Sequence, residues 1–322
     1  MTANVPFRPA LDAVLAQHAD SLAFEEEVPA LVEHFDRVAQ ETEHLGSPFD
    51  RAFVAGFLSD RIGTAFGCGY LEALVSLAPL GAARPRAALA VTETGGGHPK
   101  AIATKLVPAG EDTYRIDGEK TVVTLAGAVE VLLVAVSEGS DDEGRNRIRL
   151  VRVPVDAPGV TLHRGPMLPF APEIPHAKAS LHGVRIHERD VLPGDGYARY
   201  VKPFRTVEDI HVHGAMLGHV LRIARRFDFP REAVADLLAL AVGLRALASE
   251  SPLAPATHLA LAGAIDGFER VLAGLAPAWE RVQPDVRAHF ERDAPLRKVA
   301  SKARAQRFET AWSMVGHAAI RG

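Results

Sequence analysis

The sequence has only one cysteine, Cys68, among its 322 residues. A single cysteine excludes an intramolecular disulfide and a zinc site built from several thiolates, and it is typical of a protein in a reducing compartment. Cys68 lies in the apolar stretch FGCGY, residues 66–70. Because free cysteines are usually small buried side chains, we expect Cys68 to be a core residue and not a nucleophile.

Long apolar runs and clusters of positive charge are also missing. No stretch approaches the roughly 20 apolar residues that cross a bilayer, and the start, MTANVPFRPAL, lacks the basic end and apolar core of a signal peptide. The formal net charge is −4, with 24% charged residues, so there is no basic footprint for nucleic acid. We therefore expect a cytoplasmic protein that binds neither membranes nor nucleic acid.

Apolar residues recur at helical spacing near both ends of the chain. They do so over 8–46 and 51–79, with a break at 47–50. Four further candidate helices follow the middle of the chain, at 207–227, 232–249, 255–279 and 285–319, the last interrupted near 293–295. Short connections between long helices favour an antiparallel four-helix bundle. The pattern predicts an N-terminal helical domain over 1–85 and a C-terminal helical bundle over 199–322.

The middle of the chain, residues 86–198, reads as a β domain. Runs rich in β-branched residues at 120–124 and 131–136 predict buried strands. Alternation of apolar and basic residues over 147–153 predicts a strand with one buried face. Asp117-Gly118 is a dipeptide typical of hairpin turns. Together with the helical ends, these patterns predict an α+β fold.

A triple glycine follows the first predicted strand, 87–91. Thr92-Glu93-Thr94 leads into Gly95, Gly96 and Gly97. Residues without Cβ let a backbone approach a ligand closely and turn its N–H groups toward an anion such as a phosphate. Neither the dinucleotide fingerprint nor a Walker loop is present. The glycines are therefore either a phosphate-binding loop or a plain turn.

Two motifs taken together are more specific than the glycines alone. The stretch VTETGGG at 91–97, followed by DGEK at 117–120 and by Thr124, resembles the middle domain of the acyl-CoA dehydrogenase family. That family carries a T-E-P-x-A-G-S-D loop and an N-G-x-K-x-W-I-T segment. The resemblance covers about residues 87–218. It implies an acyl-CoA dehydrogenase-like fold, with N-terminal helices, a central β-barrel-like domain and a C-terminal four-helix bundle.

The resemblance also implies residues that bind FAD. Thr92 and Thr124 match residues that hydrogen-bond the isoalloxazine ring, and the three glycines match backbone near the pyrophosphate. His98 stands in place of a serine, as a phosphate donor or as an ordinary loop residue. Val122 replaces the tryptophan that shields the flavin.

The catalytic base of the family is a carboxylate at one of two positions. At the commoner one, near the C-terminus, Ser313 and His317 replace motif residues and no acid follows. The other position matches Glu208, about ten residues before Leu217-Gly218. The resemblance thus makes Glu208 the candidate catalytic base. Its expected place near a helix start also suits a residue that only complements the helix macrodipole.

A metal site is not expected. His211 and His213 are separated by one residue, and helix positions two apart point to different faces, so these two rings cannot chelate one ion.

Two functions remain open from the sequence. The first is an FAD-dependent acyl-CoA dehydrogenase-like oxidoreductase of fatty acid metabolism, which removes an α-proton and a β-hydride from an acyl thioester. Its partners would be an acyl-CoA or acyl-carrier thioester and an electron-transfer acceptor, in a homodimer, a homotetramer or a heteromer with a related subunit. The alternative is a catalytically silent, structural or thioester-binding subunit that completes a partner's flavin site. Ser313 in place of the motif glutamine and Val122 in place of the tryptophan favour the alternative. Thr92, Thr124, the glycines and Glu208 favour the enzyme.

Overall fold

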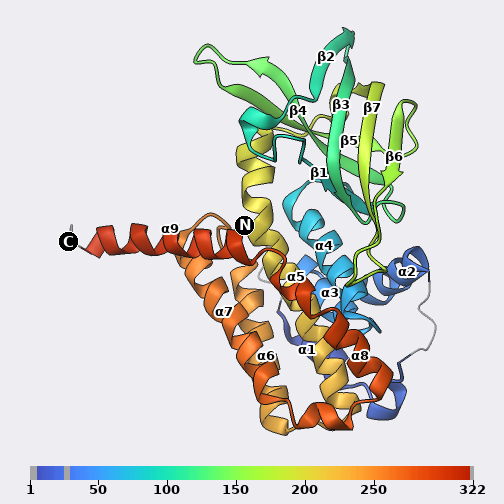
Figure 1. Cartoon of the computed structure of the whole chain (residues 1–322), viewed down its shortest axis with the longest axis vertical. Coiled ribbons are helices and arrows are strands. Elements are labelled where there is room, and N and C mark those ends of the chain that lie inside the picture. Colours follow the sequence, from blue (N-terminus) through green and yellow to red (C-terminus); the bar gives the residue numbers. More distant parts are fainter. Residues whose placement is uncertain (1–5, 25–29, 320–322) are drawn as a thin grey trace. The chain divides into compact units, whose positions relative to one another are not determined.

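The computed structural model describes residues 6–24 and 30–319 and divides them between two compact units (Figure 1). The helical unit comprises Met1–Ala73, Pro169–Glu173 and Thr206–Gly322, and the β unit comprises Leu74–Leu168 and Ile174–Arg205. Part of the predicted helical stretch 8–46, residues 25–29, lies outside the described residues. The division into 1–85, 86–198 and 199–322 stays a prediction.

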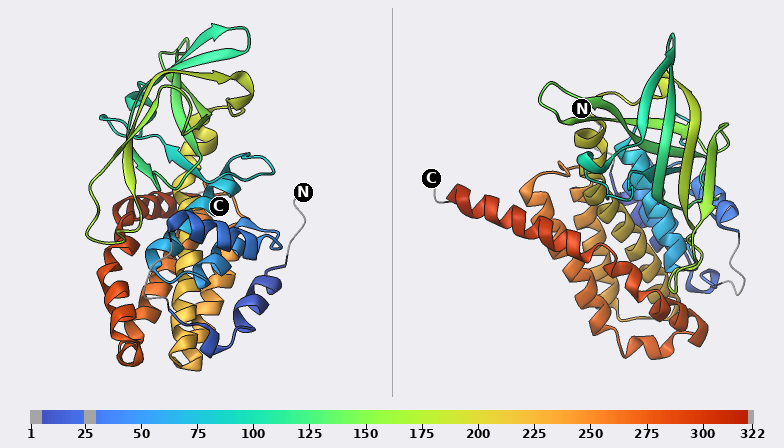
Figure 2. Two further views of the ribbon diagram at one scale, coloured as in Figure 1. Left: turned by 90° about the vertical axis from the view of Figure 1, so that its right-hand side faces the viewer. Right: turned by 45° about the horizontal axis from the view of Figure 1, so that its top comes forward.

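A curled seven-stranded sheet forms the β unit (Figure 2). Its strands run in the spatial order β1-β4-β2-β3-β7-β6, with β5 beside β4. Strand β1 is parallel to β4, whereas β3 pairs antiparallel with both β2 and β7. The bounds are β1 (Ala87–Ala90), β2 (Lys105–Gly110), β3 (Thr113–Thr124), β4 (Val131–Ser140), β5 (Asn146–Pro154), β6 (Val160–Arg164) and β7 (His176–His187).

Strand β4 forms the centre of this unit's core. Its residues 132–136 are all buried, so both faces of the strand are covered, as its continuous apolar run predicts. Strand β5 follows the predicted alternation over 147–150, but Leu150 and Val151 are both buried, so the alternation over 147–153 is interrupted there.

The predicted hairpin turn at Asp117-Gly118 is wrong. The turn between β2 and β3 lies at residues 110–113, where Asp112 has a positive φ of 53°. Gly118 lies inside β3, at a shift in the pairing register with β7, and its φ is 155°. A Cβ on Gly118 would lie 2.7 Å from the Cα of Thr104. Glycine is therefore needed here for a β-bulge and a close backbone approach.

The helical unit is helical where the sequence predicts it, but each of the two predicted N-terminal stretches is divided into two helices. Pro48 occupies the first turn of α3, so this helix begins inside the predicted break at 47–50. The predicted interruption near Asp293 separates α8 from α9. The bounds are α1 (Arg8–Leu15), α2 (Leu31–Thr42), α3 (Pro48–Phe57), α4 (Ile62–Leu77), α5 (Lys202–Arg226), α6 (Arg231–Leu247), α7 (Pro255–Gly274), α8 (Pro284–Arg292) and α9 (Ser301–Ala319). Helices α4 and α5 both continue into the β unit.

Glycines let α3 and α5 pack backbone to backbone. A Cβ on Gly218 would lie 2.1 Å from the carbonyl oxygen of Phe53, and one on Gly56 would lie 2.0 Å from that of Ala215. Elsewhere in the unit, α6 contacts α7, and α7 contacts α9. Trp279 stacks on Phe290, with ring centroids 4.4 Å apart.

The end of α9 extends beyond the other helices of this unit (Figure 1). Its large apolar side chains are exposed there: Trp312 by 60% and Met314 by 56%. Among the described residues, no helix is both long and apolar enough to cross a membrane.

Candidate functional site

The glycine loop follows strand β1 in the β unit. Glu93 and Gly96 exchange two backbone hydrogen bonds, of 3.0 and 2.8 Å, and so close a tight turn. Gly96 has a φ of 101°, which favours glycine. Because the N–H of Gly96 is used inside the loop, any anion must be held by the other backbone donors.

A buried ion pair anchors this loop to strand β3. The Nζ of Lys120, a fully buried residue, donates to Oε1 of Glu93 at 2.6 Å and to the carbonyl oxygen of Ala135 at 2.6 Å. Glu93 also accepts from the backbone N–H groups of Ala103, at 2.8 Å, and Thr104, at 3.1 Å. One carboxylate therefore ties together both ends of the loop and strand β3.

The pKa values of this pair reflect burial and pairing. Burial lowers the pKa of Lys120, and Glu93 opposes that shift. Burial alone would raise the pKa of Glu93, but the hydrogen bonds from Lys120 and Ala103 outweigh it and leave the pKa below its usual value. No local pattern in the sequence predicts this pair, although both residues belong to the two motifs that carried the resemblance.

Thr92 lies between the glycine loop and strand β3. Its carbonyl oxygen accepts from the backbone N–H of Thr121 at 2.8 Å and from the hydroxyl of Thr121 at 3.0 Å. A Cβ on Gly97 would lie 3.7 Å from the hydroxyl oxygen of Thr92, so this hydroxyl faces the loop. Thr124 ends β3 three residues beyond Thr121, about 10 Å farther along the strand.

Free backbone donors and an exposed apolar side chain lie near one another in the β unit. Within the described ranges, the N–H groups of Gly95 and Gly97 have no hydrogen-bond acceptor. Val122, on β3 between Thr121 and Thr124, is 45% exposed and offers an apolar surface. Free backbone donors beside a hydroxyl and an exposed apolar strand suit a ligand with an anionic part and a flat ring.

His98 follows the glycines directly. Its Nδ1 accepts a hydrogen bond from the backbone N–H of Lys100 at 3.3 Å, so the neutral ring carries its proton on Nε2. The ring lies near that of Tyr197, with centroids 6.3 Å apart. His98 is thus a hydrogen-bond donor at the rim of a polar cleft.

Glu208 does not lie at the start of its helix. Helix α5 begins at Lys202 and continues directly from a π-helical turn, Tyr197–Val201, so Glu208 lies in its second turn. The macrodipole stabilises acids within the first turn only, so that explanation for Glu208 is wrong. Glu208 is half-buried, in the helical unit, whereas Thr92, the glycines and Thr124 are in the β unit.

The acid next to Glu208 has a structural role. Asp209 is 5% exposed and accepts from Arg304, at 3.0 Å, and from Arg307, both on α9. This pairing fastens α9 to α5.

His211 and His213 on α5 are core residues. The Nδ1 of His211 donates to the backbone carbonyl oxygen of Val207 at 2.8 Å. The Nδ1 of His213 donates to the backbone carbonyl oxygen of Asp209 at 2.7 Å. Burial lowers the pKa of both rings, that of His211 to about 4. Nowhere in the described ranges do three or more His, Cys, Asp or Glu side chains form a group that could hold a metal ion.

Cys68 is a core residue, as predicted. It is 3% exposed, and burial raises the pKa of its thiol to about 12. Its Sγ lies 3.8 Å from Nε2 of His34, which also contacts the hydroxyl of Ser59 at 3.0 Å. Arg37 donates to Nδ1 of that ring, so Nε2 is a donor and cannot take a proton from Ser59 or Cys68. This cluster is therefore structural.

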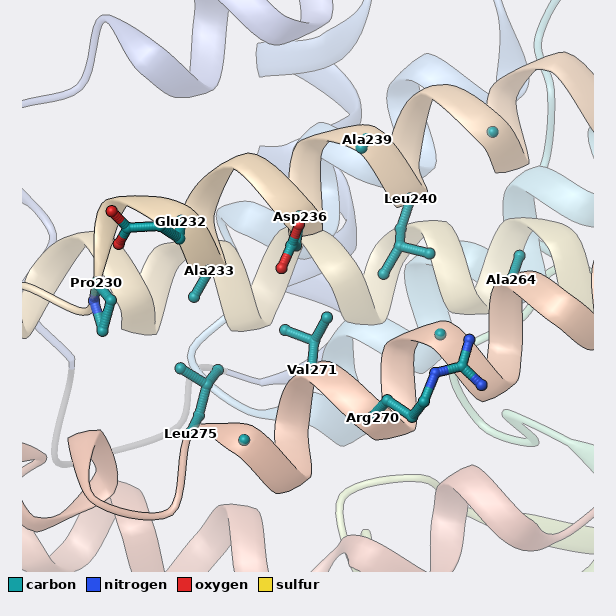
Figure 3. A pocket seen from close by; sticks show the side chains of 13 residues that line it. Pro230, Glu232, Ala233, Asp236, Ala239, Leu240, Ala264, Arg270, Val271 and Leu275 are labelled. Atoms are coloured by element: carbon teal, nitrogen blue, oxygen red, sulfur yellow. The ribbon is translucent and has the colours of Figure 1, made fainter.

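A separate groove runs between α6 and α7 (Figure 3). Its volume is about 670 Å³, and Leu240, Val271 and Leu275 project into it. None of the predicted site residues lines it.

Comparison with known proteins agrees with the fold. Residues 88–170 match the family model of the acyl-CoA dehydrogenase middle domain. A search of the curated proteins by sequence finds no match.

Solved structures resemble nearly the whole chain. A putative acyl-CoA dehydrogenase from Mycobacterium smegmatis is 18% identical, with a TM-score of 0.65 and 98% of each chain covered. Butyryl-CoA dehydrogenase from Megasphaera elsdenii is 13% identical, with a TM-score of 0.61 and coverage of 95% of this chain and 94% of the other. The prolyl acyl carrier protein oxidase AnaB is also 13% identical, with a TM-score of 0.61 and 96% of each chain covered.

The resemblance first recognised in the sequence is thereby confirmed. Residues 88–170 match the acyl-CoA dehydrogenase middle domain in sequence, and nearly the whole length of the chain has the fold of acyl-CoA dehydrogenases.

Proposed function

We propose that this chain is an FAD-dependent oxidoreductase that desaturates an acyl thioester between its α- and β-carbons. The observation that carries the proposal is the glycine loop. The buried pair of Glu93 and Lys120 holds it beside β3, with the Thr92 hydroxyl and the N–H groups of Gly95 and Gly97 free for a ligand.

Each part of the β unit would have one task in holding FAD. The N–H groups of Gly95 and Gly97 would bind the pyrophosphate, with His98 as an additional donor. The hydroxyls of Thr92 and Thr124 would bind the edge of the ring, and Val122 would contact its face. FAD, when bound, supplies the acceptor for the hydride that leaves the β-carbon.

Glu208 would take the α-proton. Of the acids that family position places at the α-carbon of the substrate, Glu208 is the one this chain retains. Its neighbour Asp209 has a different role, because it is engaged with Arg304 and Arg307 of α9.

Turnover of an acyl thioester by Glu208→Gln tests this role. Glutamine keeps the size and hydrogen bonding of the side chain but takes no proton at neutral pH. Turnover should fall by about 10²–10⁴-fold, the contribution of a positioned general base, while flavin content stays that of the wild type. Glu232→Gln, an exposed acid on α6, is the matched control. Turnover of Glu208→Gln at the wild-type rate would remove Glu208 from the mechanism.

Gly97→Ala tests the cofactor loop. Its added Cβ would meet Val91 and Thr92 at 3.5 and 3.7 Å, ordinary contact distances, so the protein itself tolerates the change. A substitution of Gly96 would not serve here, because Gly96 has a positive φ and a side chain there would strain the loop itself. Gly97→Ala should lower flavin affinity at an unchanged melting temperature. Unchanged affinity would mean that the loop is only a turn.

The substrate class and partners follow the same proposal. The related structures include, by their names, a dehydrogenase of an acyl-CoA and an oxidase of a prolyl acyl carrier protein. We propose a thioester of CoA or of an acyl carrier protein, an electron-transfer acceptor, a cytoplasmic location, and a homodimer, homotetramer or heteromer.

One observation favours a catalytically silent subunit as second candidate. Val122 stands in place of the flavin-shielding tryptophan, and this smaller side chain is 45% exposed. The visible absorption spectrum of the purified chain separates the two candidates. A flavin spectrum with turnover supports the enzyme, and neither flavin nor turnover on any acyl thioester supports the silent subunit.

A further inference from the structure

The groove between α6 and α7 is long and mostly apolar. Its lining residues run from Pro230 to Gly243 on the side of α6 and from Ala264 to Leu275 on α7. On each helix this stretch makes about three turns, or about 16 Å. Leu240, Val271 and Leu275 project into the groove (Figure 3). A groove of this length and chemistry suits the apolar face of one further helix.

Gly243 makes the groove deeper than the packing of its own unit requires. It lies inside α6, where glycine is less favourable than almost any other residue. A Cβ on Gly243 would lie in open space among the described residues, with nothing within 4 Å. Packing within the chain therefore gives no reason for a glycine here, whereas the close approach of a second helix would give one.

The end of α9 carries an apolar stripe. Phe308, Trp312 and Val315 follow one another at i, i+4 and i+7, so they share one face of the helix. The rings of Phe308 and Trp312 are stacked, with centroids 6.2 Å apart. Trp312 is 60% exposed and Val315 is 44% exposed, and none of the three lines the groove of its own chain. The stripe is about 10 Å long, so it fits within the groove.

The charges of the two surfaces are complementary. Arg270 lines the groove, and Glu309 lies beside the stripe of α9. Both side chains are exposed, and neither forms an ion pair with another of the described residues. Glu232 and Asp236 lie toward the other end of the groove (Figure 3), and Lys302 precedes Glu309 by about 10 Å along α9. One orientation of α9 in the groove therefore brings both sets of opposite charges together.

We propose that the α6–α7 groove binds the end of α9 from a second copy of this chain. The stripe of Phe308, Trp312 and Val315 lies along the groove, and Glu309 meets Arg270 of the other copy. Each copy carries both surfaces, so two copies that exchange the ends of α9 fill both grooves and close a dimer. Neither flavin nor substrate takes part in this contact.

Sedimentation velocity of the full-length chain at micromolar concentration tests the docking. The wild type should sediment as a dimer or as an assembly of dimers. Gly243→Leu fills the groove and should raise the dissociation constant of the copies by about 10–100-fold, the effect of overpacking a contact. Leucine has a higher helix propensity than glycine, so α6 itself stays folded.

A matched control comes from α7. Gly263 is also an exposed glycine inside a helix, with nothing within 4 Å of an added Cβ, but it does not line the groove. Gly263→Leu should therefore associate like the wild type. A monomeric wild type, or two glycine variants that associate equally, would overturn the proposal.

Reversal of the charges tests which surfaces meet. Arg270→Glu and Glu309→Arg each bring like charges together and should each weaken association about tenfold or more. The double variant restores an opposite pair and should associate like the wild type. Both side chains are exposed, so circular dichroism should show the same folded chain in all three variants. A double variant that associates as weakly as the single ones would contradict the pairing of α9 with this groove.

Discussion

The two units bury charge in different ways. The β unit encloses one lysine, Lys120, whose ammonium group is shared between Glu93 and the backbone carbonyl oxygen of Ala135. The helical unit uses arginines, each of which joins two helices. Examples are the pairs of Arg245 with Asp50, at 2.5 Å, and Arg51 with Glu72, at 2.7 Å.

The two kinds of ion pair have different roles: the lysine pair shapes a loop, and the arginine pairs hold helices together. Three donors on one ammonium can meet acceptors from several backbone segments, so Lys120 organises a loop. The planar fork of arginine matches a carboxylate and holds two side chains in one geometry, so it fixes one helix against another. Loss of the lysine pair should therefore disturb the ligand loop, whereas loss of an arginine pair should disturb helix packing.

Acid should produce the largest contrast between the units. In the helical unit, burial lowers the pKa of His34, His211 and His219 to about 4 each. Unfolded histidine has a pKa of about 6.5. Between these values the unfolded chain binds protons that the folded chain does not, so stability falls as pH falls from 6.5 to 4. The loss amounts to roughly 3 kcal/mol per histidine over the whole window.

The β unit should resist the same change for longer. The pKa of Glu93 is lowered by folding. Its contribution to the free energy of unfolding is therefore fully present above about pH 4.3 and is lost only as the pH falls further. In the β unit, burial also lowers the pKa of His176, but this ring is less buried than the three histidines of the helical unit. Urea unfolding followed by circular dichroism between pH 7.5 and 4.5 checks this. His211→Gln, which can still donate to Val207, should flatten the pH dependence, and an unchanged slope would contradict the assignment.

Glu93→Gln should give the next largest effect. It leaves the ammonium group of Lys120 buried without a counter-charge, which costs roughly 3–5 kcal/mol. The free energy of unfolding by urea measures this, with Glu119→Gln, an exposed acid on β3 next to Lys120, as the control. Flavin affinity should fall together with stability, because the loop loses its anchor. Equal stability of the two variants would show that the pair does not hold the loop.

Asp209→Asn should have a smaller effect in the helical unit. It removes the charge that Arg304 and Arg307 share, but their side chains are 15% and 21% exposed and can turn toward water. We expect a loss of about 1–3 kcal/mol and no change in flavin affinity. Asp266→Asn, an exposed acid on α7, is the control. A loss of flavin in Asp209→Asn at unchanged stability would contradict the comparison.

Trp312→Ser should change stability least, within about 0.5 kcal/mol, because Trp312 is 60% exposed. We expect the chain to self-associate through its C-terminal helices, and the end of α9 presents Trp312, Met314 and Val315 for this. Sedimentation at micromolar concentration should show a smaller species for the variant than for the wild type or the exposed Gln306→Ser. A monomeric wild type would be evidence against self-association.

The sequence predicted what depends on local periodicity. The long helices and the strands β4 and β5 each carry a pattern within their own residues, and two motifs identified the loop and its family. The β-bulge at Gly118 was taken for a turn because an Asp-Gly dipeptide suits both, and only the approach of Thr104 decides between them. The conformation of Gly118 thus depends on a residue that is distant in the sequence.

The ion pair of Glu93 with Lys120 and the start of α5 also could not be predicted from the sequence. Glu93 and Lys120 are separated by 27 residues, so no local pattern pairs them. Helix α5 begins before Val207, where the apolar pattern placed its start, because Pro203 fits in a first turn and the π-helical turn precedes it. This earlier start is why Glu208 lies inside the helix.

Because of where the tryptophans lie, fluorescence can distinguish the two units. The sequence has 2 tryptophans, Trp279 and Trp312, and both belong to the helical unit. Trp279 is enclosed against Phe290, whereas Trp312 is open to solvent. Indole emission therefore reports on the helical unit alone, with one buried and one exposed fluorophore. Any signal from the β unit must come from its tyrosines or from a bound chromophore, so a single sample can follow the unfolding of each unit independently.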